Sequence, residues 1–265
     1  MIKVNGKIAL IAGSGKLPQE FRNSVIKKGE EVITIGIERI TDFKTDYVLP
    51  LGKVGKLIKI LEKEEAGSIV ILGKFEHKLI YSDILKTDLT AINLLRKAKD
   101  RKPETLVRVF MDFLEEKGFR FIDPKPYLKH LLAEKGQMNR ILPDKNTLEE
   151  GKWGFGIAKE IASMDIGQTI VIKNKAVVAV EAMEGTQETI KRAGKIAGKG
   201  TVVVKVARKK QDFRIDVPTV GEDTLKVMKE IGAKALFLEA GKVFIVDKDN
   251  FLKLSDRFKI AVWGL

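Results

Sequence analysis

Short apolar runs and amphipathic segments alternate along the first third of the chain. The runs KIALIAG, EVITIGI and SIVILG are rich in apolar and β-branched residues, which predicts three buried strands. Between them, residues 17–28 and 54–67 carry apolar side chains at helical spacing. A strand–helix–strand–helix–strand order predicts a parallel sheet with right-handed crossovers. We therefore expect an α/β domain over residues 1–140.

The pattern becomes more helical in the middle of the chain. Residues 85–99 and 104–117 predict two helices, FRFID predicts a strand, and residues 127–134 predict a short helix. The stretch ILPDKNTLEEGKWG that follows contains Pro, Asp, Asn and Gly, which are typical of connecting segments. We expect residues 141–153 to form a linker.

The second half of the chain again combines segments with helical spacing of apolar residues and segments typical of strands. Helices are predicted near residues 155–163, 186–196 and 224–231, and a last helix at DNFLKLSDR before KIAVWG. Two hairpins are predicted, one formed by TIVIKN and AVVAVEA and the other by ALFLEAGKVFIV. Two single strands are predicted at TVVVKVA and DFRIDVP. Hairpins favour a mixed sheet over a purely parallel one, so we expect a mixed-sheet α/β domain over residues 154–265.

Composition sets the broad class. The chain has 265 residues, 44% of them hydrophobic and 32% charged, enough for a core and a charged surface. It has no apolar run of about eighteen residues, so no membrane-spanning helix is expected. The N-terminal apolar run is short and is followed by glycines, which suits a first strand better than a signal peptide. Without Cys there are no disulfides, and the cytoplasm is the simplest compartment.

A net charge of +13 raises nucleic acid, an anionic membrane and phosphorylated ligands as partners. Lys is spread along the chain among Glu and Asp, aromatic residues make up only 7%, and no nucleic-acid signature appears. We therefore expect no nucleic-acid partner. A Lys/Glu-rich, Cys-free composition also fits adaptation to heat, which explains much of the charge without a ligand.

A glycine-rich turn follows the first predicted strand. Gly13, Ser14 and Gly15 lie between KIALIA and a predicted helix, where backbone N–H groups can approach a phosphate. The dinucleotide fingerprint needs a third glycine where Pro18 stands. Contact with a phosphate and a purely connecting turn explain the motif equally well.

Acidic residues follow a second predicted strand. Glu181 and Glu184 precede Gly185 and Thr186, and Thr186 is the expected N-cap of the next helix. The acids suit a divalent cation and the Gly-Thr pair suits a phosphate, but ordinary capping with solvated acids is the simpler interpretation. The turn at residues 165–168 presents Gln168 as a polar tip, with function and structure equally good explanations.

The stretch KKQDFRIDVPTVG offers two acids around an arginine. On a strand, Asp212, Arg214 and Asp216 would share one face. Phosphoryl transfer needs this mixture of carboxylates and a guanidinium. An exposed strand face with an internal ion pair gives the same pattern. The pattern alone therefore does not distinguish an active site from an exposed strand face. The chain has no P-loop, no G-x-S-x-G elbow and no cluster of its two His residues.

These motifs in order, IAGSGKLP, DIGQ, VEAMEGT, KKQDFRIDVPTVG and LEAGKVFIVDK, resemble the UDP-2,3-diacylglucosamine pyrophosphatases of the LpxI type. The resemblance spans almost the whole chain and is densest over residues 165–265. It implies a Rossmann-like N-terminal domain, a C-terminal α/β domain and a substrate cleft between them. The implied reaction is Mg²⁺-dependent hydrolysis of UDP-2,3-diacylglucosamine to UMP and lipid X in lipid A biosynthesis. A homodimer that works in the cytoplasm, peripheral to the inner membrane, is also implied.

The resemblance also assigns roles to residues. It implies that the Q-D-x-R-x-D-x-P stretch contains an essential Asp, but it does not indicate which of the two Asp residues this is. The implied catalytic residues are Asp212, Arg214 and Asp216. The implied metal ligands are Glu181, Glu184, Asp212 and Asp216. The implied substrate contacts are Gly13, Ser14, Gly15, Gln168, Gly185, Thr186 and Gln211.

Two departures from the family pattern remain. Gln187 stands where the family commonly has Asp, which shifts the expected metal role toward Glu181 and Glu184. Residues 99–103 read KDRKP where the family tends to have Gly-Asp-Asp, so no catalytic role is expected there. The alternatives are a non-catalytic Rossmann-like module that binds or senses a nucleotide, and a basic protein that binds nucleic acid.

Overall fold

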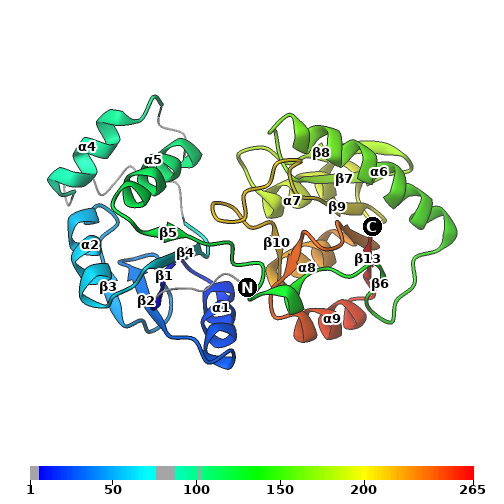
Figure 1. Cartoon of the computed structure of the whole chain (residues 1–265). Helices are drawn as coiled ribbons and strands as arrows, with labels where there is room; N and C mark the ends of the chain where they lie inside the picture. The colour runs from blue at the N-terminus through cyan, green and yellow to red at the C-terminus, as the bar shows by residue number, and fades with distance from the viewer. Residues whose placement is uncertain (1–5, 76–86, 101–102) are drawn as a thin grey trace. The chain divides into compact units, whose positions relative to one another are not determined.

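The computed structural model describes residues 6–75, 87–100 and 103–265, and divides the chain into two compact units (Figure 1). Unit 1 contains residues 1–129 together with the short segment 212–216, and unit 2 contains residues 130–211 and 217–265. The division in sequence thus falls near residue 130. None of the helices in the described ranges is long and apolar enough to cross a membrane.

Unit 1 is built on a five-stranded parallel sheet in the order β3-β2-β1-β4-β5, as the strand–helix alternation predicts. The strands are β1 (Ile8–Ala12), β2 (Val32–Ile37), β3 (Tyr47–Leu49), β4 (Ser68–Leu72) and β5 (Arg120–Phe121). The helices are α1 (Lys16–Lys27), α2 (Val54–Lys63), α4 (Leu89–Lys97) and α5 (Pro103–Glu116). Residues 85–86 of the helix predicted over 85–99 lie outside the described residues.

Unit 2 is built on a six-stranded mixed sheet in the order β6-β13-β11-β9-β7-β8, which confirms the predicted sheet type. The strands are β6 (Gly136–Gln137), β7 (Thr169–Lys173), β8 (Ala176–Val180), β9 (Val202–Lys205), β11 (Ala235–Leu238) and β13 (Ala261–Gly264), and a separate parallel pair joins β10 (Thr219–Val220) to β12 (Phe244–Ile245). The helices are η2 (Lys129–Leu131), which begins one residue before the unit does, α6 (Lys145–Ser163), α7 (Thr186–Ala197), α8 (Glu222–Ile231) and α9 (Lys248–Arg257).

Side chains alternate between the two faces of this sheet. Val202 and Val204 of β9 pack with α6, whereas Val203 packs in the core formed with α7, α8 and α9. Figure 1 shows α6 on one side of the sheet and α8 and α9 on the other. The alternation places the side chain of Lys205, at the end of β9, on the α7 face.

The segment expected to be a linker is mostly helical, and that prediction is wrong. Residues 145–153 form the first turns of α6, with Asp144 as N-cap accepting a hydrogen bond from the Thr147 amide. Its glycines mark close approach of the helix to the sheet rather than a flexible connection. A Cβ at Gly151 would lie 2.4 Å from the ring of Phe237, and one at Gly154 would lie 2.5 Å from Ile172.

The second predicted hairpin is also wrong, whereas the first one is confirmed. β7 and β8 pair antiparallel as expected. β11 belongs to the six-stranded sheet, but β12 pairs with β10 instead of turning back on β11. The connection at residues 239–243 therefore leads from one sheet to another.

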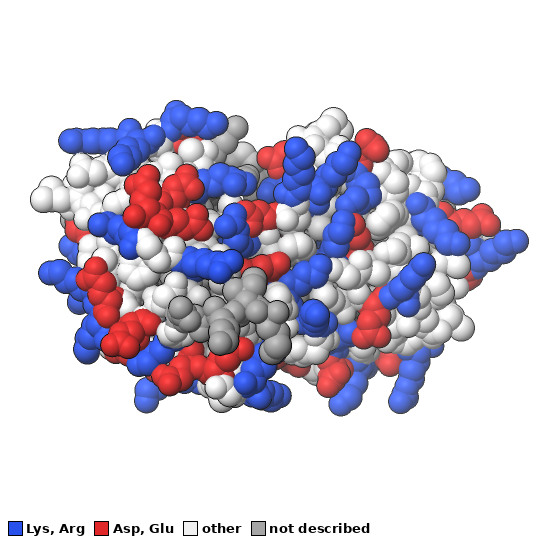
Figure 2. Space-filling view, viewed as in Figure 1, with Lys and Arg blue, Asp and Glu red and all other residues white. Residues whose placement is uncertain are grey.

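Charged side chains are distributed as the sequence suggests. Figure 2 shows Lys and Arg interspersed with Asp and Glu over the visible face, with some small groups of one sign. Such a mixture keeps most surface charges near a partner of opposite sign.

Candidate active site

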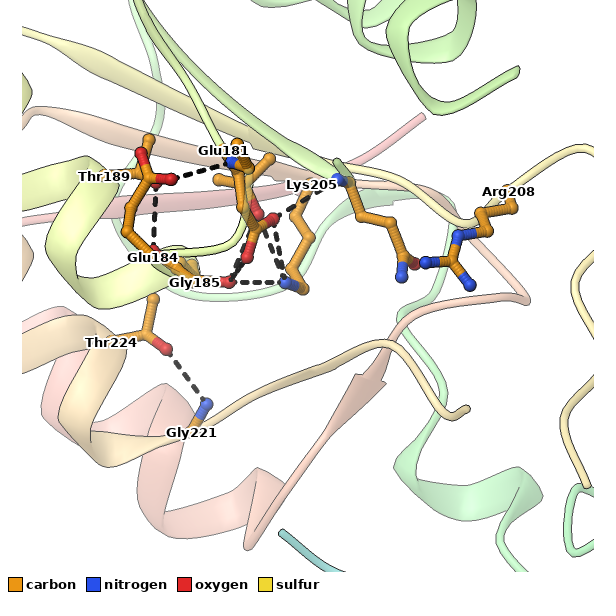
Figure 3. Close-up of polar contacts among 12 residues, drawn as sticks. Glu181, Glu184, Gly185, Thr189, Lys205, Arg208, Gly221 and Thr224 are labelled. Carbon is orange, nitrogen blue, oxygen red and sulfur yellow. Dashed lines mark hydrogen bonds and ion pairs between the residues drawn. The ribbon is translucent and has the colours of Figure 1, made fainter. Parts of the chain in front are cut away.

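A buried lysine organises a polar cluster in unit 2 (Figure 3). Lys205 lies at the carboxyl end of β9, and its side chain is only 7% exposed. Its ammonium donates to the hydroxyl of Thr186 at 2.7 Å and to that of Thr169 at 3.1 Å, and it lies 3.9 Å from the carboxylate of Glu181. Thr169 is the register partner of Lys205 on β7. A lysine at this depth needs such partners because an isolated buried charge is strongly unfavourable.

Glu181 connects this cluster to the turn that contains Gln168. Its carboxylate accepts a hydrogen bond from the Thr186 hydroxyl at 2.7 Å and a longer one from the Gln168 amide at 3.3 Å. The turn passes so close to Glu181 that a Cβ on Gly167 would lie 1.9 Å from the Glu181 carbonyl oxygen. The structure therefore brings together Gln168, Glu181 and Thr186, three of the residues predicted from sequence.

Glu184 and Gly185 form the entry to α7. Gly185 is the N-cap, with φ +81°, so the expected N-cap Thr186 is instead the first helical residue. The Gly185 conformation favours glycine, which explains why the cap is not Thr. Glu184 pairs with Arg192, whose hydrogen bond is the main cause that lowers the pKa of Glu184. Its side chain is thus held by its own helix.

The D-x-R-x-D stretch is a turn and not the predicted strand. The amides of Ile215 and Asp216 both donate to the carbonyl oxygen of Asp212, each at 3.1 Å. The Asp212 carboxylate accepts from the Arg214 amide at 3.1 Å and from its guanidinium at 3.0 and 2.8 Å. The hydrogen bond from Arg214 lowers the pKa of Asp212 and raises that of Arg214. The contact with Arg214 therefore favours the ionised form of the Asp212 carboxyl.

This turn belongs to unit 1, although the sequence places it inside the predicted C-terminal domain. Ile215 packs against the core of unit 1, and the guanidinium of Arg214 lies 3.6 Å from Glu115. The ammonium of Lys125 lies 5.0 Å from the ring centroid of Phe213, a cation–π contact. The chain leaves unit 2 after Gln211, which accepts a hydrogen bond from the Arg208 amide at 3.0 Å.

The N-terminal glycine turn has a packing explanation. A Cβ on Gly13 would lie 2.6 Å from the carbonyl oxygen of Lys74, because the backbones at Ser14 and Lys74 form an isolated bridge. The amide of Gly15, expected to face a phosphate, donates to the carboxylate of Asp42 at 3.0 and 3.2 Å. An internal carboxylate therefore occupies one of the anion-binding groups at the start of α1.

The predicted metal ligands do not form an assembled ion site within the described residues. No group of three or more His, Cys, Asp and Glu side chains there is arranged to hold a metal ion. Glu181 and Glu184 lie in unit 2, whereas Asp212 and Asp216 lie in unit 1. The carboxylates of Glu181, Glu184 and Asp212 accept hydrogen bonds from side chains of the protein.

Sequence reasoning missed two charged groups beside the predicted ones. Lys205 ends a strand of three valines, and a charged residue closing a buried run is a signal that was available. Glu239 follows β11 and accepts from Lys159 at 2.9 and 3.0 Å, from Lys242 at 2.9 Å and from the Ala207 amide at 2.8 Å. No local pattern indicates that residues this far apart in sequence will meet.

Family models match both parts of the chain. The model described as LpxI N-terminal domain matches residues 7–131, and the one described as LpxI C-terminal domain matches residues 134–263. A relative over nearly the whole chain is the UDP-2,3-diacylglucosamine pyrophosphatase LpxI of Caulobacter vibrioides. It is 24% identical over an alignment of 274 positions that covers 98% of this chain and 97% of that protein.

Solved structures align with low scores. A biotin carboxylase complex from Campylobacter jejuni aligns with TM-score 0.28 and 14% identity, over 73% of this chain and 42% of that one. A GalE-like L-threonine dehydrogenase from Cupriavidus necator aligns with TM-score 0.30 and 9% identity, over 97% and 96% of the two chains. Superpositions at these scores indicate nothing about function.

The two domain models belong to one family, follow each other in the expected order and leave only a few residues unmatched between them. The full-length relative carries the same family name. From these matches, the chain belongs to the LpxI family.

Proposed function

We propose that the protein hydrolyses the pyrophosphate bond of UDP-2,3-diacylglucosamine, giving UMP and 2,3-diacylglucosamine 1-phosphate (lipid X) in lipid A biosynthesis. The observation that carries this proposal is the alignment, over 98% of the chain, with a relative named for that pyrophosphatase activity. The chain supplies suitable chemistry: a guanidinium for the phosphates and carboxylates that can act on water.

The turn at residues 212–216 supports a division of roles between its two acids. Both oxygens of Asp212 are used to hold Arg214. We therefore assign Asp212 the task of orienting the guanidinium toward the pyrophosphate, where charge grows as the bond breaks. Asp216, the second acid of the turn, would accept a proton from the attacking water. The water oxygen bonds to phosphorus as the bridging P–O bond breaks and the other phosphate leaves.

The entry to α7 supports a substrate contact in unit 2. Gly185, its N-cap residue, has no side chain to cap the helix, so a phosphate placed there would meet the positive end of the α7 dipole. Lys205 adds positive charge directly behind Thr186. Gln168, Gly185 and Thr186 would contact a phosphate group there, with Gln211 a further substrate contact on the connection out of this unit. Gly13, Ser14 and Gly15 would contact the substrate in unit 1, where Asp42 accepts a hydrogen bond from the Gly15 amide and a bound phosphate would have to displace it.

A Mg²⁺ requirement is also proposed, although the described residues do not fit a preassembled ion site. Mg²⁺ in phosphoryl-transfer enzymes is often held by one or two carboxylates and the substrate's own phosphates, so an ion can arrive with its substrate. A homodimer and peripheral contact with the inner membrane complete the proposal, in keeping with an acylated substrate.

The test is hydrolysis of detergent-dispersed UDP-2,3-diacylglucosamine by the purified protein, with Mg²⁺ and with EDTA. UMP and lipid X, quantified by liquid chromatography and mass spectrometry, should appear in equal amounts with the wild-type chain and at least about a hundredfold more slowly with Asp216→Asn. Tight binding of UMP or UDP without turnover, in protein shown to be folded, would instead favour the non-catalytic nucleotide-binding module.

A further inference from the structure

Unit 2 exposes apolar side chains on two neighbouring loops. Met183 is 99% exposed, the highest value among the large hydrophobic residues that the structure describes. Met164 is 61% exposed and Ile166 is 49% exposed. Single exposed hydrophobic residues are normal and need no explanation. Here three of them occur within two short loops, which we call the apolar loop patch (Met164, Ile166 and Met183).

The two loops lie side by side at one end of the β7–β8 hairpin. Residues 164–167 lead into β7, and residues 181–185 lead out of β8. The Glu181 amide donates to the Thr169 carbonyl at 2.8 Å, and Gly167 passes against the Glu181 backbone. Because these contacts join the loops directly, the three apolar side chains belong to one edge of the unit.

A basic segment adjoins the same edge. The Val206 amide donates to the Gln168 carbonyl at 2.9 Å, and the guanidinium of Arg208 lies 2.7 Å from the carboxylate of Asp165. The next two residues, Lys209 and Lys210, are exposed. Arg208 offsets Asp165 on the first loop, just as Arg192 offsets Glu184 on the second. The two lysines therefore leave an excess of positive charge beside the patch.

We propose that the apolar loop patch, with Lys209 and Lys210, docks on the surface of an anionic lipid bilayer. Unbranched, flexible Met side chains and an Ile can enter the boundary between headgroups and acyl chains, while the lysines contact the anionic headgroups. The charge beside the patch is what favours this occupant over a purely apolar partner. The docking proposal rests only on the exposed side chains of this patch and its two lysines. That it delivers an acylated substrate to Gly185, on the same loop, rests on the proposed function.

The absence of Cys from the sequence allows a site-specific test. Met183→Cys is labelled with a polarity-sensitive fluorophore and mixed with vesicles of phosphatidylglycerol and phosphatidylcholine. The matched control is Ile196→Cys, which is 65% exposed near the other end of α7, about 15 Å along the helix from its first residue, Thr186. The label at 183 should shift to shorter wavelength with anionic vesicles, and the label at 196 should not. Equal responses at both positions, or none at 183, would overturn the proposal.

Sedimentation with the same vesicles measures how strongly each variant partitions onto the bilayer. Met183→Ser should weaken partitioning roughly tenfold, because an exposed methionine no longer enters the interface. Lys209→Gln and Lys210→Gln should each weaken it roughly fivefold and reduce its dependence on salt. Ile196→Ser should bind like wild type. Since Met183 is almost fully exposed, its replacement should leave the fold intact.

The oligomeric state tests the alternative that the patch binds a second copy of the chain instead of a membrane. If Met183→Ser changes the sedimentation-equilibrium mass and not vesicle binding, the patch is an interface between copies and the membrane proposal fails. Turnover of detergent-dispersed substrate does not require a bilayer. Loss of vesicle binding with turnover retained therefore counts against membrane contact and not against the proposed hydrolysis, whereas no turnover with vesicle binding intact counts only against the proposed hydrolysis.

Discussion

The guanidinium of Arg214 holds the carboxylate of Asp212 by two hydrogen bonds, from Nε to Oδ1 at 3.0 Å and from Nη2 to Oδ2 at 2.8 Å. The two residues are only two positions apart, and the contact is closed by a turn whose backbone amides point to the Asp212 carbonyl. A two-point contact of this kind fixes the plane of the guanidinium as well as its position. It divides the two acids of the turn into one that positions the arginine and one proposed to act on water.

Asp216→Asn should lower kcat by at least about a hundredfold with a small change in KM, because the proposed general base is removed while the Arg214 contact remains. Asp212→Asn should raise KM and lower kcat less, since the amide can still accept one hydrogen bond from the guanidinium. Steady-state kinetics on both variants separates the two roles. Asp249→Asn, an exposed substitution at the start of α9, is the control. Reversed effects would exchange the assignments of the two acids.

Arg214→Lys should lower kcat/KM by roughly a hundredfold although charge is conserved, because an ammonium cannot reproduce the two-point contact with Asp212. Circular dichroism should remain that of wild type, since the Arg214 side chain is 37% exposed. Unchanged kinetics would remove Arg214 from the site. Lys125→Met, which removes only the contact with Phe213, provides a comparison from the same surface.

Lys205→Met should reduce the free energy of unfolding by about 3 kcal/mol, because it leaves the carboxylate of Glu181 without its buried cation. Adding Glu181→Gln should recover part of that loss, since no unpaired charge remains. Urea denaturation of the two single variants and the double variant measures the coupling. Lys226→Met, which breaks an exposed pair with Glu222, should change stability by less than about 0.5 kcal/mol. Additive single effects would show that Lys205 and Glu181 are not coupled.

The stability of unit 2 should depend on the charge of Glu239. Burial by itself raises the pKa of Glu239, but hydrogen bonds from Lys159, Lys242 and the Ala207 amide outweigh it and lower the pKa overall. A lowered folded-state pKa contributes stability above the ordinary carboxyl pKa of about 4.3, and that stability is lost as the pH falls through the folded-state value.

Glu239→Gln should therefore flatten the pH dependence of unfolding free energy on the acid side, below the ordinary carboxyl pKa of about 4.3. Urea titrations at a series of pH values give this slope. Glu222→Gln, at an exposed position on α8, should retain the wild-type slope. A slope that is the same in all three proteins would show that Glu239 does not contribute to acid sensitivity.

Gly167→Ala should destabilise the fold by about 2 kcal/mol, because its Cβ would lie 1.9 Å from the Glu181 carbonyl and one of the two loops must move. Gly156→Ala, within α6 where a Cβ meets nothing within 4 Å, should instead stabilise by about 0.5–1 kcal/mol. Thermal or urea unfolding of the pair compares the same substitution in a crowded and an open position. Equal effects would contradict the close approach of the loops.

The sequence by itself determined the elements that rest on local periodicity. The three apolar runs of the first third form β1, β2 and β4 of a parallel sheet, and the β7–β8 hairpin appears where two β-branched runs flank a turn. It also identified Gln168, Glu181 and Thr186, which the fold brings into one cluster. Periodicity succeeds there because burial of one face decides the element locally.

Tertiary structure decided the features whose partners lie far away in sequence. The glycines of α6 look like a linker until the ring of Phe237 and the side chain of Ile172 are placed against them. β12 pairs with β10 and not with its neighbour β11. The D-x-R-x-D stretch alternates like a strand, yet it forms a turn because Asp212 satisfies its backbone and Ile215 packs into the core of unit 1. The local pattern indicates which side chains can be buried, but only the assembled fold determines which residues they pack against.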